Sequence, residues 1–174
     1  DSLGCKDSTT AFVNSAPAPN PIITGTLQFC NGQSTTLSTG TFNTYEWRNG
    51  VNAIVGTSGT LNVTTADNFF VRVSNGFGCF ANSPIVTTSL YPFTPPTISG
   101  GSSFCPGGNV TITASAGYSA YVWRNGVGSI VGVNQNLVVN TAGTYTVTVT
   151  SANGCEGIAS RTVTLNPVPT PVIT

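Results

Sequence analysis

The chain has 174 residues, with five Lys or Arg, five Asp or Glu and no His, so only 6% of its residues are charged and its formal net charge is zero. Typical soluble proteins contain about 25% charged residues, and this low charge argues against a nucleic-acid-binding surface, a polybasic membrane anchor and phosphate binding. No apolar run approaches the roughly 20 residues that span a bilayer, so we expect no direct membrane insertion. With no His and few carboxylates, we expect neither an enzyme nor a bound cofactor.

An internal repeat with a period of about 76 residues organises the whole chain. The segment 45–51 recurs almost unchanged as 121–127. Further matching pairs are Phe29 with Phe104, Cys30 with Cys105, Leu61 with Leu137 and Cys79 with Cys155. The register predicts the last strand of a preceding repeat at residues 1–16, whole repeats at 17–92 and 93–167, and the linker and first strand of a following repeat at 168–174. We therefore expect the chain to be a window of a longer array.

Short strands are predicted throughout each repeat, because apolar and polar residues alternate with the period of a half-buried strand. In the second repeat, taken in chain order, the predicted strands cover residues 96–98, 110–114, 121–123, 137–139, 144–149 and 161–165. The dipeptide at 125–126 is Asn-Gly, which predicts a type I′ hairpin turn, and the Asn-Gly at 153–154 predicts a second turn. No helical periodicity is present, so the pattern predicts an all-β fold, an antiparallel β-sandwich.

Three of these segments resemble the strands of immunoglobulin-like domains. Residues 108–114 resemble strand B with Ala114 at the core cysteine position, and residues 121–123 resemble strand C with the core Trp123. Residues 142–147 resemble the tyrosine corner and strand F, with Tyr145 at the corner and Val147 at the second core cysteine position. In the first repeat Phe69 replaces the corner tyrosine, which puts that corner hydrogen bond in question. The resemblance implies tandem immunoglobulin-like β-sandwiches in a linear array.

The fuller pattern joins Phe-Cys-x-Gly, Tyr-x-Trp-x-Asn-Gly, Gly-Thr-Tyr-x-Val-x-Val, Asn-Gly-Cys and a Pro-x-Pro-x-Pro connector. It resembles the Ig-like and PKD-like repeats of very large bacteroidete-type surface adhesins, the SprB-like gliding adhesin class. The resemblance implies type IX secretion, display on the surface of a Gram-negative bacterium, and a role as a stalk segment of a long filament in adhesion or gliding motility. Expected partners are neighbouring repeats of the same polypeptide, surface polysaccharide and other filament subunits.

The five cysteines leave two pairing schemes open. Pairing within repeats would join Cys30 to Cys79 and Cys105 to Cys155. In the immunoglobulin-like topology, however, strands B and F run in the same direction, so these partners would lie at opposite poles, about 30 Å apart. The alternative scheme joins Cys30 to Cys155 between adjacent repeats and leaves the partners of the other cysteines, Cys5 among them, outside the chain. A metal site is not expected, because no His is present and the cysteines are dispersed.

Trp47 and Trp123 could stack on carbohydrate, but their strand C positions favour packing in the core, together with Tyr145, Phe69 and Val147. An alternative function is therefore a glycan-binding accessory module of a secreted multidomain enzyme. Ser2 and Ser8 stand in Asp-Ser-Leu and Asp-Ser-Thr sequences, which match the O-glycosylation motif of bacteria in the resembled group.

Overall fold

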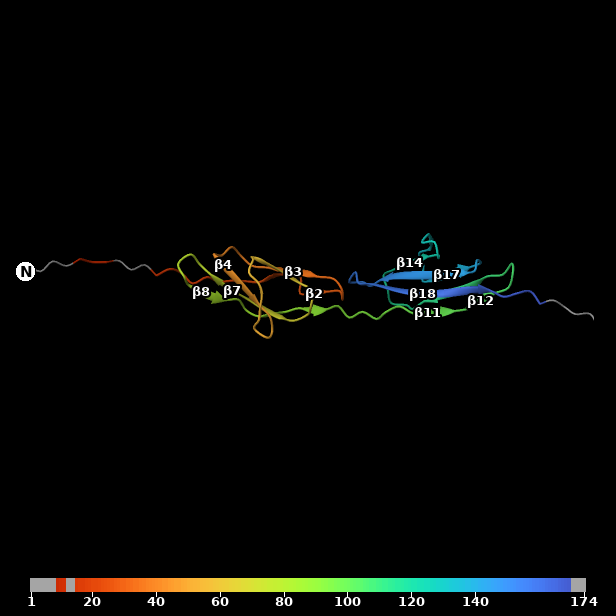
Figure 1. Ribbon diagram of the computed structural model, residues 1–174, viewed down its shortest axis with the longest axis horizontal. Coiled ribbons are helices and arrows are strands. Elements are labelled where there is room, and N and C mark those ends of the chain that lie inside the picture. The colour runs from red at the N-terminus through yellow and green to blue at the C-terminus, as the bar shows by residue number, and fades with distance from the viewer. Residues whose placement is uncertain (1–8, 12–14, 170–174) are drawn as a thin grey trace, which may run out of the picture. The chain divides into compact units, whose positions relative to one another are not determined.

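A computed structural model describes residues 9–11 and 15–169, and the regular structure of these residues is entirely β. The chain divides into two compact units: Asp1–Phe29 with Gln33–Ser89, and Cys30–Gly32 with Leu90–Thr174. In Figure 1 the strands of the first unit run from orange to yellow-green and those of the second from green to blue. The described residues include no helix long and apolar enough to cross a membrane.

The first unit contains two main antiparallel sheets. One sheet orders β1 (Thr24–Gly25), β3 (Thr35–Ser38) and β6 (Thr60–Val63). The other orders β5 (Ile54–Gly56), β4 (Thr44–Arg48), β7 (Asn68–Ser74) and β8 (Phe80–Asn82), with β9 (Val86–Thr87) also paired to β7. A short third pairing joins β2 (Gln28–Phe29) to β10 (Ser89–Leu90).

The second unit repeats this arrangement with longer strands. One sheet orders β11 (Ile98–Gly100), β13 (Val110–Ala114) and β16 (Asn136–Val139). The other orders β12 (Ser103–Phe104), β18 (Glu156–Leu165), β17 (Gly143–Thr150), β14 (Ala120–Arg124) and β15 (Ile130–Gly132). The β12–β18 pairing is parallel, and the other pairings in this unit are antiparallel.

One apolar core lies between the two sheets of each unit. In the second unit it combines Ile112 of one sheet with Trp123 and Val147 of the other, all fully buried. Trp123 lies directly opposite Val147 in the β14–β17 ladder, and both face inward because alternate residues of a strand point to the same side. Burial of each such side chain contributes about 1.5–3 kcal/mol. The predicted all-β class, with immunoglobulin-like antiparallel β-sandwiches in tandem, is confirmed.

The chain corner that precedes β17 in the second unit and β7 in the first unit is held by different hydrogen bonds in the two units. The Tyr145 hydroxyl donates a hydrogen bond of 2.8 Å to the Thr141 carbonyl, which is the tyrosine corner. Phe69 is buried at the equivalent place and has no hydroxyl. In its unit the buried Thr88 hydroxyl accepts a hydrogen bond from the Asp67 amide and donates one to the Asp67 carbonyl, each 3.1 Å long. The first unit therefore lacks the tyrosine-corner bond and instead holds the residue just before β7 with a threonine from between β9 and β10.

The prediction of a type I′ turn at Asn125-Gly126 is wrong. The Gly128 amide donates to the Asn125 carbonyl, and Gly128, with a φ of 84°, is the residue in the left-handed region. The hairpin therefore has a three-residue loop ending in a left-handed residue, with a register shift beside it between Trp123 and Arg124. Asn125 begins the turn because its side-chain oxygen accepts the Ser129 amide at 2.9 Å.

The first unit forms the same turn with a different residue in the left-handed position. Asn52, with a φ of 63°, takes the place of Gly128. In each unit an arginine donates from Nη1 to the carbonyl of the left-handed residue at 3.0 Å, Arg48 to Asn52 and Arg124 to Gly128. These arginines therefore hold the hairpin loop closed.

Two strands differ from their predicted ranges by more than one residue at an end. β11 begins at Ile98, not at residue 96. β18 begins at Glu156 instead of residue 161, because its first half pairs with β17 up to the Thr150–Glu156 position. The turn between β17 and β18 therefore contains only residues 151–155.

Candidate functional site

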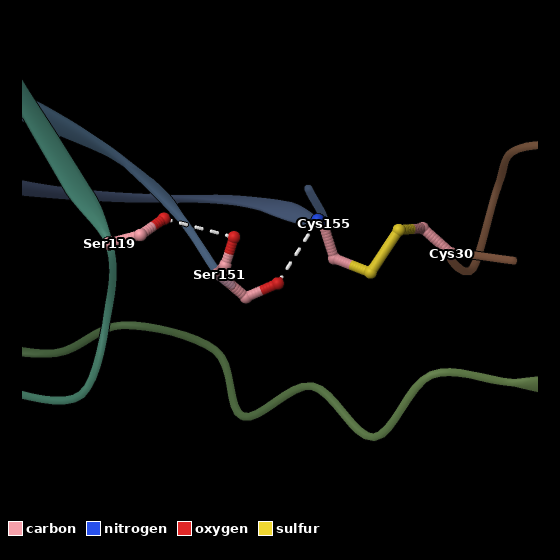
Figure 2. Close-up of a disulfide and its surroundings, with 4 residues drawn as sticks. All are labelled: Cys30, Ser119, Ser151 and Cys155. Carbon is pink, nitrogen blue, oxygen red and sulfur yellow. Dashed lines mark hydrogen bonds between the residues drawn. A yellow bond between two sulfur atoms is a disulfide. The ribbon is translucent and has the colours of Figure 1, made fainter. Parts of the chain in front are cut away.

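The chemically distinctive feature of the described residues is a disulfide between Cys30 and Cys155, 125 positions apart in the chain, with a Cα–Cα distance of 5.4 Å (Figure 2). This is one of the two pairing schemes that the sequence left open, and the pairings of Cys30 with Cys79 and of Cys105 with Cys155 do not form. By its contacts the segment Cys30–Gly32 belongs to the second unit, although the repeat register places it in the first repeat.

Cys155 is held at the end of the turn between β17 and β18. Its carbonyl accepts the Ser151 amide at 2.8 Å, and its own amide donates to the Ser151 hydroxyl at 3.1 Å. Gly154 takes the left-handed conformation that the turn requires, with a φ of 80°. The Ser119 hydroxyl donates to the Ser151 carbonyl at 3.0 Å, which ties the turn to the start of β14 (Figure 2). The cysteine backbone is thus positioned by hydrogen bonds within its own unit.

Cys30 follows the buried Phe29 directly and precedes a turn in which Gly32 has a φ of 79°. The exposed fractions of Cys30 and Cys155 are 6% and 2%. Thiol–disulfide exchange requires access of an attacking thiolate to a sulfur atom. The burial of both residues therefore slows reduction of this bond in the folded protein.

Cys79 and Cys105 are free thiols in the structure, the first partly buried and the second exposed. Cys79 ends the turn between β7 and β8, as Cys155 ends the turn between β17 and β18, and Cys105 occupies the repeat position of Cys30. Cys5 lies outside the described residues, as do the predicted glycosylation positions Ser2 and Ser8.

The two tryptophans lie inside the cores. Both are fully buried, and each donates its indole N–H to a backbone carbonyl at 2.8 Å, Trp47 to Ser58 and Trp123 to Asn134. Neither ring offers a face to a ligand. The other predicted core residues, Phe69, Tyr145 and Val147, are also buried.

Arg161 has a structural role that the sequence reading missed. From β18, its guanidinium donates to the carbonyls of Ile98 at 3.0 Å and Gly100 at 2.6 Å, both on β11 of the other sheet. The available signal was its position: Arg161 is two residues from the buried Val163, so it points to the inner side of its strand. A charged residue in that alternation indicates a contact across the sandwich edge.

A groove of the second unit has a volume of about 480 Å³ and is lined by Asn, Thr, Gly, Ala, Val, Leu and Tyr residues. The lining contains no acidic, basic, histidine or cysteine side chain that could act as a nucleophile or general base at neutral pH. Within the described part of the chain, no three His, Cys, Asp or Glu residues lie close enough to hold a metal ion.

No protein-family model matches the chain, and no curated protein is similar to it in sequence. Similar solved structures include fibronectin(III)-like modules of CbhA from Clostridium thermocellum, with 15% identity, 83% of this chain and 95% of that chain covered, and a TM-score of 0.40. Murine CEACAM1b has 13% identity, coverage of 83% and 100%, and a TM-score of 0.39. The insect immune protein hemolin has 15% identity, coverage of 88% and 49%, and a TM-score of 0.42. At these identities and TM-scores the similarities carry no conclusion about what this chain does.

Proposed function

We propose that the chain is a structural stalk segment of an extracellular surface adhesin, a spacer that carries tension and has no catalytic activity. The observation that carries this proposal is the Cys30–Cys155 disulfide. When the chain is pulled from its two ends, the shortest covalent path runs from Cys30 through the disulfide to Cys155. Residues 31–154 form a loop outside this path and are protected from tension while the bond is intact.

An extracellular location follows from the same bond within this proposal. Structural disulfides form and persist in oxidising environments and are rare in the reducing cytosol. The low charge of the chain and the absence of ionisable catalytic groups from the groove of the second unit also suit an inert spacer.

The finer form of the proposal rests on the repeat pattern. In that form the segment belongs to a long adhesin filament on a Gram-negative bacterium, exported by type IX secretion and used in surface adhesion or gliding. Immunogold labelling of intact cells with an antibody to this segment tests it: labelled surface filaments support it, and label confined to the cytoplasm contradicts it.

Single-molecule extension of the chain by its two ends tests the tension-carrying role. With the disulfide intact, we expect unfolding to release only the length of the residues outside the loop. Reduction should add the length of the loop, whose 125 residue steps correspond to roughly 400–450 Å when extended.

The matched control is the double variant Cys30→Ser with Cys155→Ser, which should release the full length without reductant. An unreduced native chain that extends as far as this variant would contradict the proposal.

The glycan-binding alternative is tested with a glycan array on the intact chain. The spacer proposal expects no specific binding, because neither tryptophan presents a face to solvent. Specific and saturable glycan binding would favour the alternative.

A further inference from the structure

We propose that Cys79 and Cys105 are the complementary halves of a second disulfide site, and that Cys105 of one chain pairs with Cys79 of a second copy. The pairing reproduces between chains what Cys30 and Cys155 form within the chain. In this proposal the partner is a second molecule of the same repeat protein, whose Cys79 turn meets the Cys105 segment of the first.

The turn that presents Cys79 has the same geometry as the turn that presents Cys155. The Cys79 carbonyl accepts the Asn75 amide at 3.0 Å, and the Cys79 amide donates to the Asn75 side-chain oxygen at 3.0 Å. Gly78 has a φ of 81°, against 80° for Gly154. Asn75 thus makes the same two hydrogen bonds to Cys79 that Ser151 makes to Cys155, so the backbone of the cysteine is held in the same way in both units.

The segment that presents Cys105 also matches the segment that presents Cys30. Each cysteine follows a buried phenylalanine, Phe104 or Phe29. Each precedes a turn whose glycine has a φ of 79°, Gly107 in one case and Gly32 in the other. The chain therefore contains two copies of each half of the disulfide, and one copy of each half is bonded.

The bonded cysteines and the free cysteines differ in their solvent exposure. Cys30 and Cys155 are buried, whereas Cys79 is partly exposed and Cys105 is exposed. Phe77, in the same turn as Cys79, has an exposed fraction of 80%. A large exposed aromatic side chain beside an accessible thiol provides apolar area that a docked partner would cover.

The proposed contact joins two different surfaces, so it is heterologous. Such contacts form open chains unless the rotation between subunits closes a ring. A growing oligomer keeps one free Cys79 on one terminal molecule and one free Cys105 on the other, so addition can continue. Contacts between two Cys79 residues or two Cys105 residues have no counterpart in the Cys30–Cys155 bond.

The bond forms by oxidation of two thiols. With glutathione disulfide as oxidant, one cysteine thiolate attacks the glutathione disulfide and releases one glutathione thiol. The second cysteine thiolate then attacks the mixed disulfide and releases the other. Two protein thiols and one glutathione disulfide thus give one protein disulfide and two reduced glutathione molecules.

This inference goes beyond the proposed tension-carrying role and can fail separately from it. A chain in which Cys79 and Cys105 never pair would still show the extension behaviour expected from the Cys30–Cys155 bond.

The test uses two full-length variants, both with Cys5→Ser. One also carries Cys105→Ser and retains Cys79, and the other also carries Cys79→Ser and retains Cys105. One variant is labelled with ¹⁵N, the two are mixed in a glutathione redox buffer, and the products are separated on a non-reducing gel and mapped by mass spectrometry. The Cys30–Cys155 peptide and the circular dichroism spectrum serve as the folding control.

We expect the mixed Cys79–Cys105 dimer to exceed either homodimer by at least about tenfold, which corresponds to a preference of about 1.4 kcal/mol. The single variant Cys5→Ser should form a ladder of head-to-tail oligomers under the same conditions. A statistical mixture of the three dimers, no dimer at all, or a Cys79–Cys105 bond within one monomer would each overturn the proposal.

Discussion

Tyr145 and Phe69 occupy the same position of the two repeats, and only Tyr145 has the hydroxyl that forms the corner hydrogen bond. Tyr145→Phe removes this hydrogen bond to the Thr141 carbonyl. We expect it to lower the free energy of opening of the second unit by about 1 kcal/mol. Native-state hydrogen exchange of the β17 amides measures this quantity in the second unit alone.

The control for Tyr145→Phe is Tyr121→Phe in the same unit. The Tyr121 hydroxyl makes longer hydrogen bonds, 3.4 Å from the Tyr118 amide and 3.3 Å to the Ser115 carbonyl. Its removal should therefore cost less. Equal losses in the two variants would show that the corner contributes nothing specific.

Gly157 lies where no side chain fits. A Cβ atom added there would be 2.5 Å from Phe93 Cζ and 2.8 Å from Pro96 Cδ. Because Phe93 packs against the core of the second unit and the Tyr118 ring, it cannot move freely. We expect Gly157→Ala to destabilise the second unit by about 1–3 kcal/mol, the usual cost of overpacking, visible as a lower Tm in calorimetry.

Gly143→Ala provides the comparison for Gly157→Ala, since no atom lies within 4 Å of a Cβ at that position. It should change stability by less than about 0.5 kcal/mol. An equally small loss of stability in Gly157→Ala would contradict the close packing of Phe93 against Gly157.

At the scale of elements, the β14–β15 hairpin distinguishes two glycines that are close in sequence. Gly128 is in the left-handed region, whereas a Cβ at Gly126 would meet only the Thr144 carbonyl oxygen at 3.8 Å, an ordinary contact. Gly128→Ala should therefore cost about 1 kcal/mol, and Gly126→Ala much less. Urea denaturation midpoints of the two variants give the order. A type I′ turn at Asn125-Gly126 would make Gly126→Ala the more damaging substitution.

The strands could be predicted from the sequence because their burial alternates residue by residue, as in Thr144–Val149, where every second side chain is buried. The positions of the turns at Asn125-Gly126 and Asn153-Gly154 could also be predicted, but the type of the first turn could not, because an Asn-Gly pair can also open a three-residue loop that ends in a left-handed residue. Which of the two forms depends on the next residues, Gly128 or Asn52. The inward position of Arg161 was visible, but its acceptors on β11 depend on how the sheets pack.

The disulfide partner of Cys30 could not be predicted from the sequence for a different reason. Disulfide formation depends on the distance between cysteines in the folded chain, and sequence separation does not determine that distance. The repeat register alone would have paired cysteines within each repeat. The immunoglobulin-like strand directions made the Cys30–Cys155 alternative plausible, and the choice between the two schemes needed the structure.

At the scale of the whole molecule, one covalent bond fastens Cys30, which directly follows β2 of the first unit, to Cys155 of the second unit, and each unit has its own core. Cross-linking residues so far apart restricts the unfolded chain, with an expected stabilisation of about 4–5 kcal/mol for a loop of this size. Because Cys30 is bonded to Cys155, unfolding of the second unit with the bond intact leaves a closed loop that includes residues 33–89 of the first unit. The bond therefore opposes unfolding of the second unit even while the first remains folded.

We accordingly expect Cys30→Ser with Cys155→Ser to lower the Tm of the second unit by about 15 °C or more, since about 1 kcal/mol corresponds to 4–8 °C for a domain of this size. The pair Cys79→Ser with Cys105→Ser is the matched control, because it removes the two free thiols and leaves the Cys30–Cys155 bond intact. Calorimetry without reductant should show a large shift for the first pair and little for the second. Equal shifts would mean that the serine substitutions, and not the lost cross-link, cause the effect, and an unchanged Tm in the first variant would contradict the stabilising role of the bond.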